Sequence, residues 1–312
     1  MTSTAYHKVF FSRNVPYAIN RFRQQLCKNV ANSISVECFA AEESCITRKE
    51  LLEGVKGCTG IFCLLTDEVD AEVLDAAGPS LRVVSTMSVG YNHIDVEACR
   101  ARNVKVGYTP GVLNVSTAET AVALTFATKR RLLDTVGVVG LGRIGTTYAR
   151  MLKNGFNCKI LYTGPREKVQ NAKSLMGDPG SVEFVNIETL LRESDIVSLH
   201  QPLTEATCCS IGGKEFKMMK SSAVLINTGR GELVDEDALV EALKTKEIAA
   251  AGLDVTTFEP LSPLHPLFSL DNCIVLPHIG SATVKTRQAM VDIAVANLAA
   301  GVQDEELPHS VC

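Results

Sequence analysis

With 312 residues, the chain is longer than one hydrophobic core usually organises, so two domains are expected. Its 46% hydrophobic and 21% charged residues are typical of a globular protein in water, and a net charge of -4 without basic runs argues against nucleic-acid and membrane-surface partners. No apolar run has the length of a membrane span and the N-terminus lacks a signal-peptide pattern, so we expect a cytoplasmic protein.

Eleven cysteines are many for such a chain, but no CxxC pair or Cys/His cluster has the spacing of zinc ligands, so no metal site is predicted. Most of them, such as Cys63, Cys158 and Cys273, fall in apolar runs that predict buried strands, where we expect reduced core thiols. The adjacent Cys208 and Cys209 could form a redox-sensitive pair, although a structural role is the simpler interpretation.

The first third of the chain alternates short β-branched runs with stretches of helical character. Such alternation predicts a parallel sheet with helices on both faces. This unit contains no phosphate-binding loop, so we do not expect it to bind a nucleotide. The predicted strands are Val9–Phe11, Ile34–Phe39, Ile61–Leu65, Arg82–Thr86 and Val104–Gly107, and the predicted helices are Pro16–Cys27, Arg48–Val55, Ala71–Ala77 and Asp95–Arg102.

The segment Met87 to His93 follows the fourth predicted strand and is rich in small residues. Backbone N–H groups are available at the carboxyl end of a parallel strand, where ligands of open α/β sheets gather. Two interpretations stay open, a ligand-binding loop that includes Val89 and Gly90, and a plain connection.

A break at Pro110-Gly111 precedes a long helix. Ser116 to Glu119 has the S/T-x-x-E pattern of a capping box, which predicts that the helix begins there and runs to about Arg131. A second α/β unit in doubly wound order follows, and a last helix closes the chain. The predicted strands of this second unit are Cys158–Tyr162, Val182–Val185, Ile196–His200, Ala223–Asn227, Ala249–Asp254 and Cys273–Leu276. Its predicted helices are Glu188–Glu193, Gly213–Lys220 and Asp235–Thr245, and the closing helix is Ser281–Ala300.

The second unit opens with a dinucleotide-binding pattern, VGVVGLGRIG, at Val136 to Gly145. Gly140 permits a tight turn, Gly142 lets the backbone approach phosphates, and Gly145 lets the helix pack closely on the strand. The first N–H groups of the helix then face the anion. A glycine-rich turn without a ligand is the alternative, but the order of strand, turn and helix favours cofactor binding.

The type of cofactor depends on the end of the next predicted strand. An NAD-selective site carries an acidic residue about twenty positions after the glycines. Here Ile160 to Arg166 contains no carboxylate, whereas Arg166 can meet a 2′-phosphate and Thr163 can add a hydroxyl. We therefore predict NADPH, with NADH possible if Arg166 is an ordinary exposed loop arginine.

Three further segments at predicted strand ends carry candidate chemistry, in Arg230, Glu259 and His278. Separately, each has a plain structural explanation: a solvated arginine, a Glu-Pro turn and a residue before a helix. Together they offer what the reduction of a 2-oxo acid requires. A guanidinium binds a carboxylate bidentately and polarises the neighbouring carbonyl, and a histidine beside a carboxylate can deliver the proton that accompanies the hydride.

The motifs GLGRIG, INTGRGELVDEDAL, AAAGLDVTTFEP and LPHIGSAT resemble those of the D-isomer-specific 2-hydroxyacid dehydrogenases. MSVG, VGYTPGVL, LYTG and AGLDV are most similar to the glyoxylate/hydroxypyruvate reductases of that family. The resemblance covers nearly the whole chain and implies two Rossmann-like doubly wound parallel-sheet domains. These are a flavodoxin-like substrate domain from both chain ends, 1–109 with 280–312, and a cofactor domain over 110–279.

The resemblance also implies roles for individual residues. Arg230 would bind the substrate, His278 would be the general acid/base, and Glu259 its partner. The substrate would also contact Val89, Gly90 and Ser281. The residues implied to line the cofactor are Thr117, Gly140, Gly142, Arg143, Ile144, Gly145, Thr163, Arg166, Pro202, Thr207, Thr228, Asp254, His278 and Gly280.

One departure from the family concerns the segment before the glycine-rich strand. Family members carry an arm there that makes much of the homodimer contact, whereas here only Leu132 to Thr135 separates Arg131 from Val136. The chain also has no tryptophan, so an aromatic of that type from a neighbouring subunit is missing. Gly111 and Gln201 are smaller departures. The short connection predicts a weakened or lost dimer and bears on full activity.

Three functions are therefore compared. The leading one is an NADPH-dependent reductase of small 2-oxo acids such as glyoxylate and hydroxypyruvate. A dinucleotide-binding regulatory protein resembling a corepressor of the same fold is the alternative from another class. A dehydrogenase of phosphoglycerate or bulkier 2-oxo acids is the third, and it would need large side chains near Met87 to Tyr91.

Overall fold

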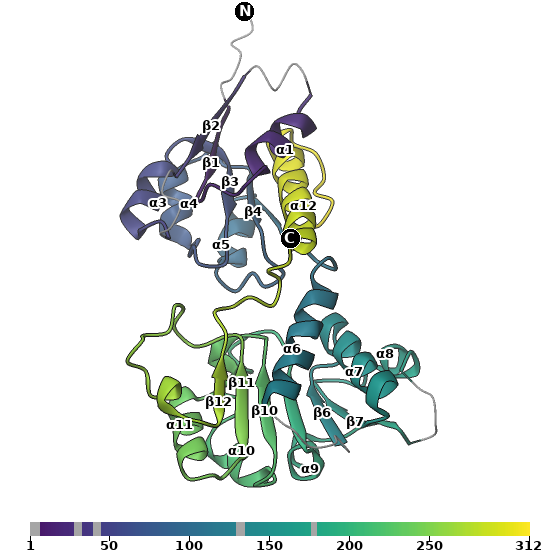
Figure 1. The fold of residues 1–312 in the computed structure, drawn as a ribbon. Helices are drawn as coiled ribbons and strands as arrows, with labels where there is room; N and C mark the ends of the chain where they lie inside the picture. Colours follow the sequence, from purple (N-terminus) through teal and green to yellow (C-terminus); the bar gives the residue numbers. More distant parts are fainter. Residues whose placement is uncertain (1–6, 28–32, 40–44, 129–134, 176–179) are drawn as a thin grey trace, which may run out of the picture. The chain divides into compact units, whose positions relative to one another are not determined.

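The computed structural model describes residues 7–27, 33–39, 45–128, 135–175 and 180–312. The chain divides into two compact units, Met1–Val112 with Val284–Cys312, and Leu113–Thr283 (Figure 1). The first unit thus contains both chain ends. The divisions fall after Val112 and Thr283, where the sequence suggested residues 109 and 279.

A five-stranded parallel sheet in the order β2-β1-β3-β4-β5 forms the centre of the first unit. This strand order is that of flavodoxin-like folds. Every residue of β3 and β4 is buried, because helices cover both faces, and neither strand alternates between buried and exposed residues. The strands are β1 (His7–Phe11), β2 (Ile34–Cys38), β3 (Cys58–Cys63), β4 (Val83–Thr86) and β5 (Lys105–Gly107).

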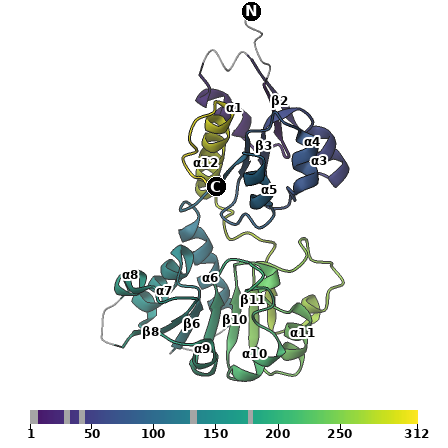
Figure 2. The ribbon, with the colours of Figure 1, turned by 180° about the vertical axis from the view of Figure 1, so that it is seen from behind.

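The helices of the first unit pack on the two faces of its sheet (Figures 1 and 2). On one face, α12 contacts β3, β4, β5 and α1. Gly60 of β3 faces α12 so closely that a Cβ atom there would lie 2.8 Å from Val302. The opposite face is covered by Leu51, Val73 and Cys99 from α3, α4 and α5. The helices are α1 (Ala18–Gln25), α3 (Arg48–Gly54), α4 (Ala71–Ala77), α5 (Val96–Ala101) and α12 (Val284–Val302).

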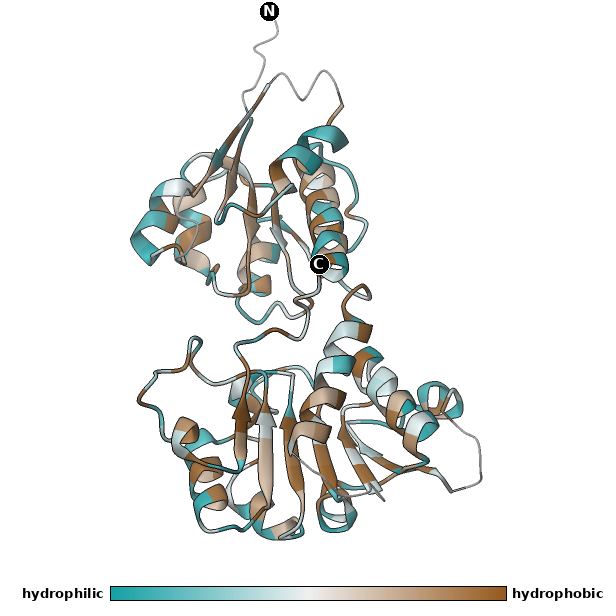
Figure 3. Ribbon diagram, in the orientation of Figure 1, coloured by the Kyte–Doolittle hydropathy of each residue, from teal (hydrophilic) through white to brown (hydrophobic). Residues whose placement is uncertain are grey.

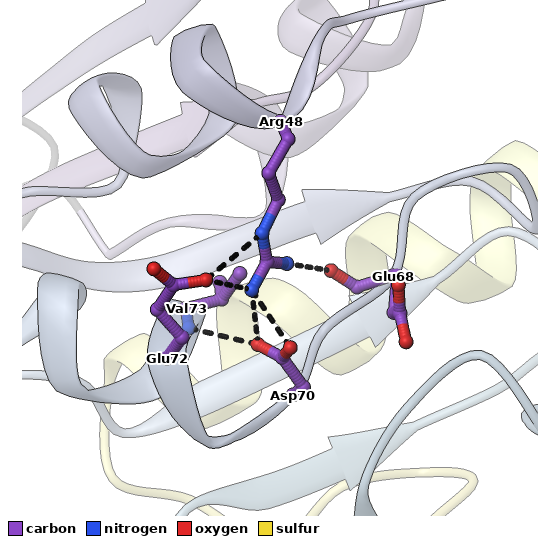
Figure 4. Close-up of polar contacts among 5 residues, drawn as sticks. All are labelled: Arg48, Glu68, Asp70, Glu72 and Val73. Carbon is purple, nitrogen blue, oxygen red and sulfur yellow. Dashed lines mark hydrogen bonds and ion pairs between the residues drawn. The ribbon is translucent and has the colours of Figure 1, made fainter.

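A cluster around Arg48 joins the starts of α3 and α4 (Figure 4). The guanidinium donates to the carboxylate of Asp70 at 2.6 Å, to Glu72 at 2.5 Å, and to the carbonyl oxygen of Glu68 at 3.1 Å. Asp70 in turn accepts from the N–H of Val73 and caps α4. The hydrogen bonds from Arg48 lower the pKa of Asp70. This cluster connects two surface helices, so its role is structural.

The second unit is built on a seven-stranded parallel sheet in the order β12-β11-β10-β9-β6-β7-β8. The chain starts at β6, adds β7 and β8 on one side, and then returns to add β9 and its successors on the other side. The order therefore reverses between β6 and β9, which is where doubly wound sheets bind their ligands. The strands are β6 (Thr135–Val139), β7 (Lys159–Thr163), β8 (Val182–Phe184), β9 (Ile196–Leu199), β10 (Val224–Asn227), β11 (Ala250–Leu253) and β12 (Cys273–Val275).

Two apolar clusters hold this second sheet between its helices. Side chains of α6 and α7, including Leu124 and Leu152, pack on one face with Val136 and Val138 of β6. Leu190 of α9, with residues of α10 and α11, packs on the other face. The helices are α6 (Asn114–Thr128), α7 (Arg143–Phe156), α8 (Val169–Lys173), α9 (Ile187–Glu193), α10 (Gly213–Met218) and α11 (Glu236–Lys244), with 3-10 helices η1 (Gly231–Leu233) and η2 (Pro266–Ser269).

Hydrophobic residues concentrate in the strands of both units, and the helices carry hydrophilic residues outward (Figure 3). This distribution is that of sheets buried on both faces. Within the described ranges, no helix combines the length and the apolar character needed to cross a membrane.

The predicted elements are observed, with limits that differ by one or a few residues in most of them and with some further short helices. The long helix begins at Asn114, two residues before the predicted start. Ser116 therefore lies inside the helix, where its hydroxyl donates to the carbonyl of Leu113 and does not cap the helix. The last helix begins at Val284 instead of Ser281, β3 begins at Cys58, and α8 was not predicted. The short connection before β6 lies mostly at residues 129–134, outside the described residues.

The cysteines are less buried than their apolar surroundings predict. Cys63 and Cys158 are buried, but Cys273 is half-buried because β12 is an edge strand of its sheet. Cys208 and Cys209 are exposed, with their sulfur atoms 3.9 Å apart. The expectation that most cysteines are core residues was therefore wrong.

Candidate active site

The glycine turn after β6 has the geometry that its three glycines predict. Gly140 has a φ of 97° and donates to the carbonyl of Thr163 at 3.0 Å, and a Cβ on it would lie 2.9 Å from the chain after β9. A Cβ on Gly145 would lie 2.2 Å from the Gly140 oxygen. Gly142, the N-cap of α7, has open space where its Cβ would be. Two of the glycines thus close the turn, while the third leaves room for a ligand.

The first turn of α7 and the end of β7 flank this opening. Arg143 is exposed and Ile144 is half-buried at the start of the helix, where the first backbone N–H groups have no intrahelical acceptor. Thr163 ends β7, and Arg166 is exposed three residues later. Arg166 has no hydrogen bond or ion pair with another residue in the described ranges. These positions suit the phosphates of a dinucleotide.

The chain after β9 and β10 supplies further polar groups. Thr207 donates through its hydroxyl to the carbonyl of Pro202 at 2.7 Å, which closes the loop between them. Thr228, directly after β10, is buried, and its hydroxyl oxygen has no partner among the described residues. A buried hydroxyl without a hydrogen-bond partner costs free energy. A bound ligand that formed a hydrogen bond with Thr228 would remove this cost.

Asp254, directly after β11, holds the segment after β12. Its carboxylate is 1% exposed and accepts from the N–H groups of Ile279 and Gly280, each at 2.8 Å. The main-chain oxygen of Asp254 also accepts from the N–H of His278. Burial is the main cause that raises the pKa of Asp254. Thr117 of α6 lies beside Gly280, and Ser281 follows at a half-buried position.

His278 and Glu259 are brought together although 19 positions separate them. Nδ1 of His278 lies 2.6 Å from Oε2 of Glu259, and the second carboxylate oxygen accepts from the N–H of Thr256. His278 has a φ of 54°, a left-handed conformation that is uncommon for a non-glycine residue. The N–H groups of His278, Ile279 and Gly280 all donate to Asp254, which holds this conformation, and Nε2 is the ring nitrogen that remains for other chemistry.

Arg230 follows Thr228 in the turn after β10. Asn227 shapes this turn, since its amide donates to the carbonyl of Arg230 at 2.8 Å and its side-chain oxygen accepts from the N–H of Gly229. Sequence reasoning missed Asn227, although an Asn before Thr-Gly suggests such a turn. Burial lowers the pKa of the Arg230 guanidinium, and Glu259 and Glu232 oppose this effect. A guanidinium removed from water interacts strongly with an anionic ligand.

A second residue that sequence reasoning missed is His200, the residue after β9. It is half-buried beside the glycine turn, with Nε2 2.8 Å from the hydroxyl of Ser198 and its ring 4.9 Å from that of Tyr148. Burial lowers the pKa of His200 to about 3, so the ring is neutral near pH 7. In the sequence, His200 only ends an apolar run, and nothing there predicts its contacts with Ser198 and Tyr148.

In the first unit, Val89 and Gly90 lie in the loop after β4, at the carboxyl end of the sheet. Both are half-buried, and their backbone N–H groups donate to no other described residue. The loop therefore has amide groups available for an anion.

A doubly wound parallel sheet with this glycine turn at its switch point belongs to the dinucleotide-binding class of proteins. Residues 120–280 match the family model of the D-isomer specific 2-hydroxyacid dehydrogenase, NAD binding domain. The chain belongs to this family of NAD(P)-dependent oxidoreductases. The family resemblance stated from the sequence is thereby confirmed, as is the fold.

Individual relatives include the glyoxylate reductase/hydroxypyruvate reductase of Mus musculus, 44% identical over 292 residues, with 85% of this chain and 88% of the relative covered. The Homo sapiens protein of the same name is 41% identical over 330 residues, with 97% of each chain covered. Among solved structures, an NADPH-dependent glyoxylate/hydroxypyruvate reductase of Sinorhizobium meliloti, in complex with NADP and malonate, is 29% identical with a TM-score of 0.80, covering 98% of this chain and 97% of that one.

Proposed function

We propose that this chain reduces small 2-oxo acids, such as glyoxylate and hydroxypyruvate, with NADPH as the hydride donor. The observation that carries the proposal is the 2.6 Å hydrogen bond between His278 and Glu259, on the same sheet edge as the Arg230 turn and the glycine turn. Relatives named as glyoxylate reductases support the substrate class.

His278 is the proposed proton donor. The carboxylate of Glu259 accepts from Nδ1, which fixes the orientation of the ring. Nε2 then carries the proton that passes to the carbonyl oxygen of the substrate as the alcohol forms. After transfer, Nδ1 keeps its proton and its hydrogen bond, so the ring stays in position.

Arg230 is the proposed binding group for the 2-oxo acid. A guanidinium offers a planar fork of donors that matches a carboxylate and can also polarise the adjacent carbonyl. Because Arg230 is half-buried, its attraction to an anion is less screened by water than that of an exposed arginine. We also propose that the amides of Val89 and Gly90 bind the carboxylate, and that Ser281 contacts the substrate.

The residues around the glycine turn fit a dinucleotide. Gly142 with the first turn of α7 would hold the pyrophosphate, and the buried hydroxyl of Thr228 would find a partner. The remaining proposed contacts are Thr117, Arg143, Ile144, Thr163, Pro202, Thr207, Asp254 and Gly280. When bound, the reduced nicotinamide supplies the hydride.

The proposed preference for NADPH depends on Arg166. It is exposed just after β7 and makes no hydrogen bond or ion pair to another described residue, so it is available for a 2′-phosphate. Comparing the dissociation constants of NADPH and NADH by fluorescence titration tests this preference, and tighter binding of NADH would contradict it.

We propose that dimerisation is weak or absent. At most residues 129–134 separate α6 from β6, whereas the family resemblance implies a substantial arm there. Light scattering coupled to size-exclusion chromatography measures the mass in solution. A monomer at micromolar concentration is expected, and a stable dimer would show that the arm is dispensable.

The central experiment is NADPH consumption with glyoxylate and with hydroxypyruvate. His278→Asn should lower kcat by at least about a hundredfold, the usual contribution of general acid catalysis. Arg230→Ala should raise KM about ten- to a hundredfold, as expected for a lost charge-assisted hydrogen bond. His265→Asn and Arg192→Ala are matched controls, because His265 forms a separate pair with Glu236 and Arg192 is exposed on α9.

Equal rates in wild type, His278→Asn and Arg230→Ala would contradict the catalytic assignment. Tight NADPH binding without turnover of either substrate would instead favour the dinucleotide-binding regulatory protein. Faster reduction of a bulky 2-oxo acid than of glyoxylate would contradict the proposed substrate class.

A further inference from the structure

The loop after β4 is held by a network of buried hydroxyl groups in the first unit. Ser88, which is 4% exposed, lies with its Oγ 2.5 Å from the carbonyl oxygen of Gly90 and 2.9 Å from Oγ1 of Thr86. Thr86 is fully buried, and its Oγ1 lies 3.0 Å from Nε2 of His93. The network thus connects both ends of the loop to the peptide at its centre.

The direction of these hydrogen bonds follows from the number of protons. A serine or threonine hydroxyl carries one proton, and a carbonyl oxygen only accepts. Ser88 therefore donates its one proton to the carbonyl oxygen of Gly90. In the contact between the two hydroxyl groups, Thr86 must then be the donor. The contact between Thr86 and His93 then requires a proton on Nε2. All three contacts are hydrogen bonds only when His93 donates to Thr86, Thr86 to Ser88, and Ser88 to Gly90.

Anchored carbonyl groups also orient the N–H groups of the loop, because C=O and N–H of one planar trans peptide point in opposite directions. The carbonyl of Ser88 accepts from the N–H of Thr109 at 2.9 Å, so the N–H of Val89 points away from Thr109. The carbonyl of Gly90 is turned toward buried Ser88, so the N–H of Tyr91 points away from the core. Like those of Val89 and Gly90, the Tyr91 N–H donates to no other described residue.

We infer that Ser88, Thr86 and His93 are positioning residues for carboxylate binding, and that the N–H of Tyr91 is a further donor beside those of Val89 and Gly90. The inference rests on the proposed function, in which this loop binds the carboxylate of the 2-oxo acid. The three side chains act through the peptide between Gly90 and Tyr91, which they hold with its N–H outward.

Ser88→Ala tests the inference because it removes the donor to the Gly90 carbonyl. The KM for glyoxylate should rise about tenfold, the effect of one hydrogen bond, while kcat changes less than about twofold and the Kd for NADPH stays the same. Thr86→Val should give a smaller rise, and Thr86→Ser, which keeps the hydroxyl, should have nearly the wild-type KM.

Ser85→Ala is the matched control. Ser85 is also fully buried on β4, but its hydroxyl donates to the carbonyl of Ala294 in α12 at 2.7 Å, away from the loop. It should lower stability without changing KM. An equal rise of KM in Ser85→Ala and Ser88→Ala would assign the effect to stability and overturn the positioning role.

A crystal structure of Ser88→Ala gives a readout that needs no activity. We expect the peptide between Gly90 and Tyr91 to rotate once its carbonyl has lost its donor. An unchanged peptide together with an unchanged KM overturns the inference. If the wild type reduces neither glyoxylate nor hydroxypyruvate, the proposed function fails, whereas a rotated peptide in the variant would still support the positioning role.

Discussion

Glu259→Gln separates the charge of the His–Glu pair from its geometry. The glutamine oxygen can still accept from Nδ1 of His278, so the ring orientation is kept while the negative charge is lost. The two side chains are 26% and 23% exposed and 2.6 Å apart. A hydrogen bond with a charged partner contributes about 1.5–3 kcal/mol, and partial exposure favours the lower end. A loss of about 1.5–2 kcal/mol corresponds to a kcat about 10- to 30-fold lower.

Steady-state rates of glyoxylate reduction at saturating NADPH give kcat for wild type and for Glu259→Gln. Chemical unfolding of both proteins shows whether the variant keeps the stability of wild type.

Glu236→Gln is the matched control, because Glu236 forms the other His–Glu pair of the second unit, with His265 at 3.3 Å. It should leave kcat unchanged. If Glu259→Gln has the kcat of wild type, or if Glu236→Gln lowers kcat equally, the reasoning about the charge is wrong.

Three further predictions concern the cofactor site and its packing. Gly142→Ala should weaken NADPH binding at unchanged stability, whereas Gly145→Ala should also cost about 1–3 kcal/mol of unfolding free energy, because its Cβ would lie 2.2 Å from the Gly140 oxygen. Arg166→Ala should weaken NADPH binding about tenfold and leave NADH binding unchanged. The pKa of His200 is lowered, so its stabilising contribution is present above the unfolded pKa near 6.5 and is lost as pH falls toward 3; His200→Gln should therefore lose less stability on acidification.

Each of these has a direct measurement. Fluorescence titration gives the cofactor affinities, and equal loss of NADH and NADPH binding in Arg166→Ala would contradict a 2′-phosphate contact. Chemical unfolding gives the stabilities, and a Gly142→Ala variant as unstable as Gly145→Ala would contradict the open space beside Gly142. Parallel pH dependence of wild type and His200→Gln would show that His200 does not carry the acid sensitivity.

Much of the fold could be predicted because local patterns dictate it. Short β-branched runs predicted the parallel strands, and the helical stretches between them predicted the layers. The glycine turn was predictable in detail, since each of its three glycines has a local reason: a positive φ at Gly140, open space at Gly142 and a close contact at Gly145. The family was recognisable from motifs of the same local kind.

Errors arose in the limits of elements and in the burial of individual residues. The Ser116 capping pattern failed because the helix already begins at Asn114, and the burial of Cys273 was overestimated because only the strand order makes β12 an edge. The sequence also could not predict that the carboxylate of Asp254 accepts hydrogen bonds from the N–H groups of Ile279 and Gly280. Such contacts join residues far apart in the chain.

The sequence by itself therefore determined the class of fold, the cofactor turn and the types of side chain available for chemistry. Only the tertiary structure decided that Glu259 meets Nδ1 of His278, that Thr228 is buried without a partner among the described residues, and that the hydroxyl of Ser88 donates to the carbonyl of Gly90. The physical reason is that periodicity and turn chemistry act over a few residues. Hydrogen bonds between strand ends, in contrast, exist only once the sheet has set their order and register.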